Sequence, residues 1–433
     1  MKYYSLQHKA PNASFQEAVV RGIAPDRGLY FPEEISPLPT SFFKNIKSLS
    51  NEEIAFRAIQ QFVGDEIDEK SLRGIIAETV SFVFPMVKLS ENITSLELFH
   101  GPTMAFKDVG ARFMARCLGH FAEHSKQKQD VTVLVATSGD TGGAVASGFL
   151  GVEGVKVVIL YPSGKVSDIQ EKQLTTLGQN ITALEVDGSF DDCQEMVKTA
   201  FLDNDIISKK QLTSANSINV ARWLPQLFYF LFAYKQLEDA SRPVVFSVPS
   251  GNFGNICAGM MAHKLGMPVS QFIASVNSND VVTRFMESGE YIPKPSVATI
   301  SNAMDVGNPS NFIRIREIFN NDFESLSKKL TSYSFTDSET RGAISSINEA
   351  YNYTADPHGA VGYLGLRKYL EDKPEIQGVF LETAHPIKFL DVVESVIDKK
   401  ITLPEDIKTL ILNEKKSISI KNYEEFKAYM MHS

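Results

Sequence analysis

The stretch VTVLVATSGDTGGAVASGFL, residues 131–150, decides the fold class of this chain. Its first part, VTVLVA, is apolar and rich in β-branched residues, which predicts a buried strand. SGDTGG has the composition of a loop, and AVASGFL is expected to form a helix directly after it. A strand that leads through a glycine-rich loop into a helix is the repeating unit of α/β proteins, so we expect that class.

The same alternation of strand and helix continues along the chain. VKVVILYP at 155–162 and ITALEV at 181–186 are further predicted strands, each followed by a helical pattern. Later strands are predicted at PVVFSVP, QFIASV and GVFLET, which are residues 243–249, 271–276 and 378–383. This order predicts parallel or mixed sheets with helices on both faces.

The N-terminal segment has a different pattern. PDRGLYFPEEI at 25–35 predicts a short strand between two turns. NEEIAFRAIQQFV at 51–63 predicts an amphipathic helix with Asn51 as its N-cap. Residues 320–350 are polar and are expected to be helical.

A chain of 433 residues is too long for one ordinary hydrophobic core. We expect a small N-terminal domain over residues 1–90 and a central region over 91–400. The central region would consist of two interleaved α/β domains, because no linker interrupts it. Residues 401–433 are charged and are expected to form a helical tail.

Composition narrows the function classes. The chain is 43% hydrophobic and 22% charged, as soluble globular proteins are. Its net charge of -9 and the absence of a basic stripe argue against nucleic-acid binding. The three cysteines are far apart in sequence, which suits a reducing compartment. No secretory signal and no run of about 18 apolar residues is seen, so we expect a cytoplasmic protein without a membrane span.

The first loop that could bind a ligand is ATSGDTGGAV, residues 136–145. Ligands of open α/β sheets bind at the carboxyl ends of strands, and helix N-termini expose N–H groups that suit anions. Thr137, Ser138 and Thr141 add hydroxyl groups to this loop. A helix cap with glycine turns, without any ligand, is an equally good interpretation of this loop alone.

The second loop, SVPSGNFGNICAG at 247–259, has the same design. Gly251 and Gly254 allow close approach of the backbone to a ligand, and Asn252 and Asn255 can donate hydrogen bonds. The loop matches neither GxxxxGK[ST] nor GxGxxG. Two such loops on one sheet favour a phosphate site, although a capped turn remains an alternative.

Lys107 follows the turn HGPTMAF and precedes a helix expected to start near Val109. Val109, Phe113, Cys117 and Phe121 fall on one stripe of that helix, so the helix is expected to pack on the core. A lysine desolvated there would have a lowered pKa and a usable amine, which forms Schiff bases with carbonyls and with pyridoxal phosphate. The simpler interpretation is an exposed charge at a helix start.

Two polar stretches are further candidates. SANSINVARWLPQ at 214–226 offers Asn216, Asn219 and Arg222, whose spacing of three would place them on one helical face. Arg222 could bind a carboxylate or a phosphate with two hydrogen bonds, and an ordinary surface arginine is the alternative. AMDVGNPSNF at 303–312 is interpreted as a structured loop.

LETAHPIKF, residues 381–389, follows the last predicted strand. The hydroxyl of Thr383 could donate a hydrogen bond to a ring nitrogen of a ligand. A lone His385 is more often a structural residue than a catalyst. The histidines show no metal-ligand spacing, and no G-x-S-x-G motif is present, so we expect neither a metal site nor an esterase-type serine.

Together, these motifs resemble one family. FHGPTMAFKD, ATSGDTGGAVA, SANSINVAR, VPSGNFGN, AMDVGNPSNF and LETAHPIKF occur in the order found in threonine synthases. FQEAVVRGIAPDRGLYFPEEI at 15–35 resembles the opening of that family. The resemblance extends from about residue 3 to about residue 390. It implies the tryptophan-synthase-β-like fold of pyridoxal phosphate enzymes, fold type II. The implied reaction converts O-phospho-L-homoserine and water to L-threonine and phosphate.

The resemblance also implies roles for individual residues. Lys107 resembles the lysine that binds pyridoxal phosphate covalently, and Thr383 resembles the hydroxyl residue that faces its ring nitrogen. The cofactor phosphate would lie against the loop of Gly251, Asn252, Phe253, Gly254 and Asn255. The loop Thr137, Ser138, Asp140 and Thr141 resembles the site for the substrate α-carboxylate. Asn216, Asn219 and Arg222 are candidates for the substrate phosphate.

Some positions distinguish this chain from its relatives. Cysteine synthases, cystathionine synthases and dehydratases tend to have SGN where this chain has SGD with Asp140, as threonine synthases do. The phosphate loop ends in Asn255 where several relatives have aspartate, and Val109 replaces a phenylalanine found in many.

Three alternatives stay open at the level of sequence. Another pyridoxal phosphate enzyme of this fold, such as a phosphoamino-acid lyase or threonine dehydratase, is the nearest. A non-catalytic binding protein with the same fold is the second. A dinucleotide-dependent oxidoreductase is disfavoured because neither loop has GxGxxG with an acidic residue about 20 positions later. We expect a small-molecule substrate and a monomer or homodimer.

Overall fold

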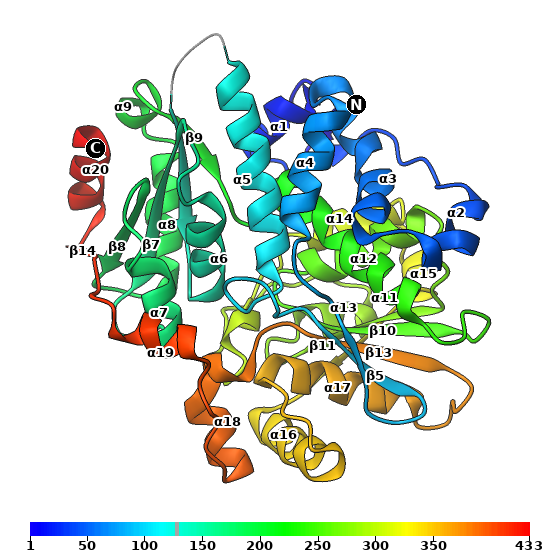
Figure 1. The fold of residues 1–433 in the computed structure, drawn as a ribbon. Coiled ribbons are helices and arrows are strands. Elements are labelled where there is room, and N and C mark those ends of the chain that lie inside the picture. Colours follow the sequence, from blue (N-terminus) through cyan, green and yellow to red (C-terminus); the bar gives the residue numbers. More distant parts are fainter. Residues whose placement is uncertain (126–129) are drawn as a thin grey trace.

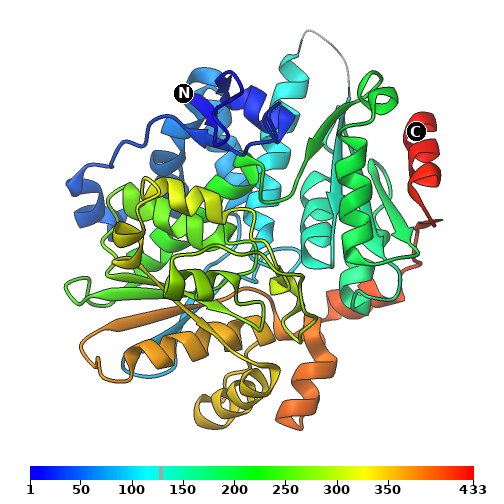
Figure 2. The ribbon, with the colours of Figure 1, turned by 180° about the vertical axis from the view of Figure 1, so that it is seen from behind.

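The computed structural model describes residues 1–125 and 130–433, and within them the strands form three sheets (Figures 1 and 2). The smallest sheet belongs to the N-terminal segment and is antiparallel, with order β2-β1-β3. Its strands are β1 (Lys2–Ser5), β2 (Ala13–Ser14) and β3 (Tyr30–Pro32). The accompanying helices are α1 (Phe15–Arg21), α2 (Thr40–Asn45), α3 (Asn51–Val63) and α4 (Glu69–Thr79), with short 3-10 turns at Ile46–Ser48 and Gly64–Glu66.

The largest sheet has six strands in the order β12-β11-β10-β13-β5-β4 and is parallel except for β4. Its strands are β4 (Met86–Lys88), β5 (Ile93–Glu97), β10 (Val244–Pro249), β11 (Gln271–Val276), β12 (Leu330–Ser334) and β13 (Gln377–Glu382). The helices of this part are α11 (Leu227–Gln236), α12 (Gly254–Lys264), α13 (Val281–Ser288), α14 (Phe312–Ile318), α15 (Phe323–Ser327), α16 (Asp337–Tyr351), α17 (Pro357–Leu370) and α18 (Leu390–Ile397), with 3-10 turns at Leu224–Gln226, Asn302–Met304 and Pro386–Phe389.

The third sheet has five parallel strands in the order β14-β8-β7-β6-β9. Its strands are β6 (Val131–Ala136), β7 (Val155–Pro162), β8 (Ile181–Val186), β9 (Gln211–Ser214) and β14 (Ile418–Ile420). The remaining helices are α5 (Lys107–His124), α6 (Asp140–Phe149), α7 (Asp168–Thr175), α8 (Phe190–Ala200), α9 (Asn204–Ile207), α10 (Val220–Trp223), α19 (Glu405–Leu412) and α20 (Tyr423–His432). The expected helical tail therefore contains a strand as well, because β14 extends this sheet beside β8.

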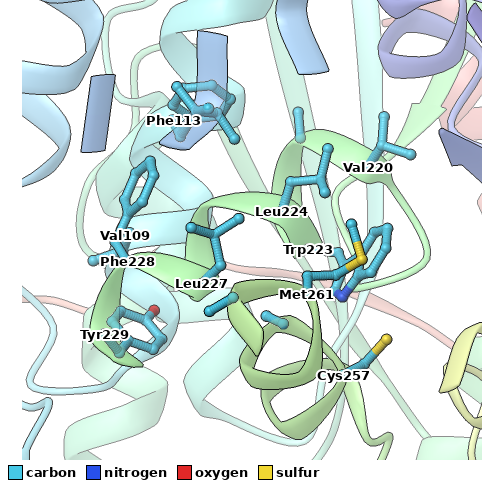
Figure 3. Close-up of a cluster of buried hydrophobic side chains, with 14 of the residues drawn as sticks. Val109, Phe113, Val220, Trp223, Leu224, Leu227, Phe228, Tyr229, Cys257 and Met261 are labelled. Atoms are coloured by element: carbon cyan, nitrogen blue, oxygen red, sulfur yellow. The ribbon is translucent and has the colours of Figure 1, made fainter. Parts of the chain in front are cut away.

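A large apolar core fixes the position of α5, the helix that begins at Lys107. Val109 and Phe113 of α5 are buried in one cluster with Trp223, Leu227 and Met261, which come from α10, α11 and α12 (Figure 3). The other two members of the predicted stripe, Cys117 and Phe121, are also buried in this cluster. The prediction of a packed helix is confirmed, and α5 also contacts α4 and α6.

Most predicted elements are present, but local details differ. The cap of α3 is Ser50, whose side chain accepts a hydrogen bond from the Glu53 N–H, and Asn51 is the first residue inside the helix. The region 320–350 is not wholly helical, because Leu330–Ser334 forms the edge strand β12 beside β11. Helix α5 begins at Lys107 rather than near Val109. No helix within the described ranges is long and apolar enough to span a membrane.

Candidate functional site

A cavity lies where strands of the two large sheets end and the following segments meet. Its lining comes from six segments that the sequence analysis identified as candidates and from a seventh around His358. The lining residues are Phe106, Lys107, Asp140, Thr141, Asn216, Ser217, Arg222, Gln226, Pro249, Gly251, Asn252, Phe253, Gly254, Asn255, Ala303, Met304, His358 and Thr383. Pro249 ends β10, and Thr383 directly follows β13, so the cavity lies at carboxyl ends of parallel strands, as expected.

The backbone around Lys107 is held by three hydrogen bonds from different elements. The Phe106 N–H donates to the Thr383 carbonyl at 2.9 Å. The phenol of Tyr229 on α11 donates to the Phe106 carbonyl. The guanidinium of Arg222 donates from Nη1 to the Lys107 carbonyl at 2.8 Å. These bonds fix the direction in which the Lys107 side chain leaves the backbone.

The turn before Lys107 is closed by Asp108. Its carboxylate accepts hydrogen bonds from the Thr103 N–H at 2.9 Å and from the Thr103 hydroxyl at 2.5 Å. On the other side of α5, a Cβ on Gly110 would lie 2.4 Å from the Arg222 carbonyl, so glycine is needed for this approach. The preparation visible in HGPTMAFKDVG therefore serves to hold one lysine in a fixed place.

The lysine itself is desolvated. Burial lowers the pKa of Lys107 to about 8, and the nearby cations of Arg222 and Lys388 act in the same direction, while Asp140 opposes them. A lysine with this pKa is unprotonated at neutral pH far more often than an ordinary lysine, and the unprotonated form is the one that reacts with carbonyl groups. The prediction of a lowered pKa agrees with this environment.

Asp140, the first residue of α6, forms a buried ion pair. Its Oδ1 lies 2.6 Å from Nζ of Lys388, and Gln170 donates to the same oxygen at 2.8 Å. Burial acts to raise the pKa of Asp140, but the charges of Lys388 and Lys107 outweigh it and hold that pKa below its ordinary value. Lys388 also donates to the Thr103 carbonyl at 2.8 Å. The pair thus joins the start of α6 to the turn that precedes Lys107.

The rest of this loop has a different role from Asp140. The Thr137 hydroxyl accepts from the N–H groups of Gly139 and Gly142 at 3.0 and 2.8 Å, so it holds the loop in shape. Within the described part of the chain, the cavity lining includes Asp140 and Thr141 but neither Thr137 nor Ser138.

The loop from Gly251 to Asn255 lies against the cavity with all five residues. A Cβ on Gly251 would lie 2.8 Å from the Ala303 carbonyl oxygen and 2.8 Å from the Met304 Cα, so no larger residue fits there. Phe253 has φ 61°, a left-handed conformation that is uncommon outside glycine and that recurs at ligand-binding turns. Asn255 uses its side-chain N–H to brace the Pro249 carbonyl at 2.8 Å.

The three polar residues of 214–222 do not share a helical face, contrary to the prediction. Helix α10 starts only at Val220, Asn219 is its N-cap, and Asn216 precedes it. The Asn219 amide donates to the Val19 carbonyl at 2.8 Å and is outside the cavity lining of the described residues. Asn216 and Arg222 do reach the cavity. The predicted shared face was wrong because α10 is a single short turn capped by Asn219, and hydrophobic periodicity does not reveal so short a helix.

Arg222 is buried, but not all of its hydrogen-bond donors have a partner among the described residues. Its Nε donates to the Ala215 carbonyl at 2.7 Å, and its Nη1 donates to the Lys107 carbonyl. No acceptor among the described residues pairs with its Nη2, although the residue is only 3% exposed. Burial lowers the pKa of Arg222 to about 10, which still leaves it charged at neutral pH. A buried guanidinium with unused donors at a cavity favours an anionic ligand.

Some cavity residues were missed at the level of sequence. His358 lines the cavity, with Nδ1 at 2.5 Å from Asp356 Oδ1 and Nε2 accepting from the Ala303 N–H at 3.2 Å. Lys388 lies within the quoted motif LETAHPIKF but had no role assigned. The sequence signal for His358 was the helix start DPH, in which Asp356 caps α17. His385 caps the turn that follows it and is structural, as expected.

Comparisons with known proteins agree with this geometry. A family model described as pyridoxal-phosphate dependent enzyme matches residues 88–379. Models described as threonine synthase N terminus and threonine synthase, C-terminal, match residues 2–80 and 359–430. The fold and site thus define a pyridoxal phosphate-dependent enzyme of fold type II.

Whole-chain relatives narrow the class further. The chain is 42% identical to a threonine synthase of Serratia marcescens over 409 residues, which cover 94% of this chain and 93% of the relative. It superposes on the crystal structure of threonine synthase from Escherichia coli with a TM-score of 0.93, 40% identity and coverage of 100% and 99%. The pyridoxal phosphate-bound threonine synthase from Brucella melitensis gives a TM-score of 0.93, 33% identity and the same coverage.

The chain belongs to the threonine synthase family. It is therefore a pyridoxal phosphate-dependent lyase, and the predicted family, fold class and cofactor are confirmed.

The lowered pKa of Lys107 predicts a pH dependence of stability in the cofactor-free protein. An unfolded lysine titrates near 10.5 and folded Lys107 near 8, so between these values the unfolded chain binds more protons. The free energy of unfolding therefore rises with pH across that window. At pH values below about 8, Lys107 is charged in both states and the folded protein bears the full cost of burying that charge. Urea unfolding of wild type and Lys107→Met from pH 7 to 10.5 measures this.

We expect the free energy of unfolding of wild type to increase, relative to that of Lys107→Met, by up to about 1.4 kcal/mol per pH unit inside this window. Because all other titrating groups are shared, the difference between the two proteins isolates Lys107. A difference that stays constant from pH 8 to 10.5 would contradict the desolvated lysine.

Proposed function

We propose that the chain converts O-phospho-L-homoserine and water to L-threonine and inorganic phosphate. The observation that carries the proposal is the convergence at one cavity of a half-buried lysine with a lowered pKa, a glycine turn at a helix start and a buried guanidinium with unused donors. A substrate with a carboxylate and a phosphate needs two anion sites beside the cofactor, and these groups provide them.

The residues at the cavity fit pyridoxal phosphate. Lys107 offers an amine with a lowered pKa at the cavity for the aldehyde of the cofactor, and its backbone is fixed by Thr383, Tyr229 and Arg222. The turn from Gly251 to Asn255 opens helix α12 and suits the cofactor phosphate, since N–H groups at a helix start favour anions. Thr383 is buried at the cavity, where its hydroxyl would face the ring nitrogen.

The start of α6 is the proposed site of the substrate α-carboxylate. Thr141 and the N–H groups of the turn would donate to it, while the Thr137 hydroxyl holds the turn in shape. The Asp140 carboxylate cannot itself attract an anion, but Lys388 neutralises it at 2.6 Å. We therefore assign Asp140 to ordering this turn and to facing Lys107 with a fixed negative charge.

Arg222 is the proposed ligand of the substrate phosphate, with Asn216 beside it at the cavity. Its Nη2 has hydrogen-bond capacity to spare, and a guanidinium binds phosphate with paired donors. Asn219 contributes indirectly, because it caps α10 and so fixes where Arg222 lies. The contact from Arg222 to the Lys107 carbonyl would link phosphate binding to the position of the lysine.

Lys107 is also the proposed general base. The bound cofactor supplies an electron sink for the substrate carbon that loses a proton. The amine of Lys107, with its pKa of about 8, accepts that proton from the α-carbon and can return it at the end of the reaction.

We further propose that residues 1–90, 91–400 and 401–433 act as the N-terminal domain, the catalytic region and the tail. The net charge of -9 and the reduced cysteines support a cytoplasmic enzyme that binds no nucleic acid. A monomer or a homodimer is the assembly we expect.

The product of the reaction distinguishes this function from its nearest rival. Incubation of the cofactor-loaded enzyme with O-phospho-L-homoserine is expected to release L-threonine and phosphate in equal amounts, measured by amino-acid chromatography and a phosphate assay. A threonine dehydratase would yield 2-oxobutyrate instead, and 2-oxobutyrate as the main product would reject the proposal. The variant Lys107→Ala is the negative control and should form neither product at a comparable rate.

The role of Arg222 predicts a specific kinetic change. Arg222→Gln removes hydrogen-bond donors that would bind the substrate phosphate. The KM for O-phosphohomoserine should therefore rise about tenfold or more, which corresponds to the loss of one charge-assisted hydrogen bond. Inhibition by added inorganic phosphate should weaken by a similar factor. Arg21→Gln, at an exposed position on α1, is the control and should change neither value. Unaltered phosphate inhibition in Arg222→Gln would show that the phosphate binds elsewhere.

A further inference from the structure

A second buried guanidinium, Arg314 on α14, lies behind the phosphate loop and has no assigned role. It is 0% exposed, and burial lowers its pKa to about 10, so it remains a buried cation at neutral pH. The indole ring of Trp223 stacks against it at 4.3 Å. Burying a cation is costly unless hydrogen bonds or an opposite charge compensate for its lost hydration.

Arg314 joins three separate segments of the chain. Its Nη2 donates to the Ile218 carbonyl at 2.6 Å and to the Tyr30 carbonyl at 3.0 Å, and its Nε also reaches Tyr30. Its Nη1 donates to the Ser217 carbonyl at 3.0 Å and to Oδ1 of Asn311 at 2.7 Å. These bonds use all five N–H groups of the side chain. Among the described residues none of its partners is a carboxylate, so its charge is not neutralised.

Asn311 connects Arg314 to the cavity through hydrogen bonds. Because Arg314 binds its Oδ1, its side-chain N–H points the other way and donates to the Ser217 hydroxyl at 3.0 Å. The Asn311 backbone N–H donates to the Asn252 carbonyl at 3.1 Å. Ser217 and Asn252 both line the cavity. A Cβ on Gly254 would lie 3.3 Å from both Asn311 Nδ2 and Ser217 Cβ, so these segments are in contact at the start of α12.

We propose that Arg314 is a positioning residue of the cofactor-phosphate site. Through Asn311 it fixes Ser217 and the loop from Gly251 to Asn255, and it places an unneutralised buried positive charge behind the site of a phosphate dianion. A planar guanidinium is required, since a lysine cannot donate to three carbonyls and an amide at once. The proposal rests on the assignment of this loop to the cofactor phosphate, which the function proposed above includes.

The hydrogen bond to the Tyr30 carbonyl also links Arg314 to the N-terminal segment. Tyr30 begins β3, whose sheet contains the first strand of the chain. The same guanidinium therefore connects the N-terminal sheet, the 217–218 turn and the 311 loop. In this arrangement, the predicted loop AMDVGNPSNF is part of the cofactor site, since its Asn311 provides the link between Arg314 and the cavity.

Comparison of pyridoxal phosphate with pyridoxal, which lacks the phosphate, tests the proposal. Trp223 is the only tryptophan of the chain, so quenching of its fluorescence reports binding of either compound to the cofactor-free protein. In Arg314→Met the dissociation constant of pyridoxal phosphate should rise about tenfold or more, as expected when a charge-assisted contact is lost. That of pyridoxal should change by less than about twofold. Arg314→Lys should fall between wild type and Arg314→Met.

Two further variants complete the design. Arg316→Lys alters a neighbouring arginine of α14 that stacks on Phe285, and it should bind both compounds as wild type does. Asn311→Ala keeps Arg314 but removes both the acceptor of its Nη1 and the link to Ser217, so it should also lose affinity for pyridoxal phosphate selectively. This variant decides the question if Arg314→Met does not fold.

The outcomes separate the possible explanations. If Arg314 only supports the fold, its variants lose affinity for both compounds equally or for neither, and the proposal is rejected. If wild type itself binds pyridoxal as tightly as pyridoxal phosphate, then the assignment of the Gly251–Asn255 loop to the cofactor phosphate is wrong. A loss confined to pyridoxal phosphate in Arg314→Met and Asn311→Ala supports the proposal.

Discussion

The site depends on the fixation of one short stretch of backbone, Phe106 to Lys107. Hydrogen bonds from Tyr229 and Arg222, and one to Thr383, hold its peptide groups from three sides. The core of α5, α10, α11 and α12 keeps the helices of Tyr229 and Arg222 in place (Figure 3). A flexible lysine on an exposed loop would be protonated and would sample many positions. Burial in this fixed frame instead lowers its pKa and directs its amine into the cavity.

Buried charges organise the rest of the cavity around this lysine. The Asp140–Lys388 pair connects the start of α6, which follows the five-stranded sheet, to the turn after the six-stranded sheet. Arg222 contacts the lysine backbone and retains donors for an anion. Arg314 connects, through Asn311, the loop from Gly251 to Asn255 to the N-terminal sheet. Each of these charges has a defined set of hydrogen bonds, as buried ions require, and together they suit ligands that carry phosphate and carboxylate groups.

The sequence predicted the parts of the site that follow strands and missed the parts that depend on packing. The loops at 136–145 and 250–255 could be located because apolar strands precede them and glycines mark the turns. The shared helical face of Asn216, Asn219 and Arg222 was wrong, because Asn219 caps a helix of one turn. Lys388 and Arg314 gave no signal, since the partners that bury them are distant in sequence. The edge strand β12 was missed because its polar residues are half exposed.

The central claim is that Lys107, rather than another lysine at the site, carries the cofactor. Lys388 is the natural competitor, because it is fully buried, whereas Lys107 is half-buried, and it lies next to Asp140. Reduction of the cofactor-loaded enzyme with borohydride, followed by proteolysis and mass spectrometry of the peptides, identifies the modified residue. The account predicts a pyridoxyl group on the peptide that contains Lys107 and its absence after Lys107→Ala. A pyridoxyl group on Lys388, or an unchanged yield in Lys107→Ala, would contradict it.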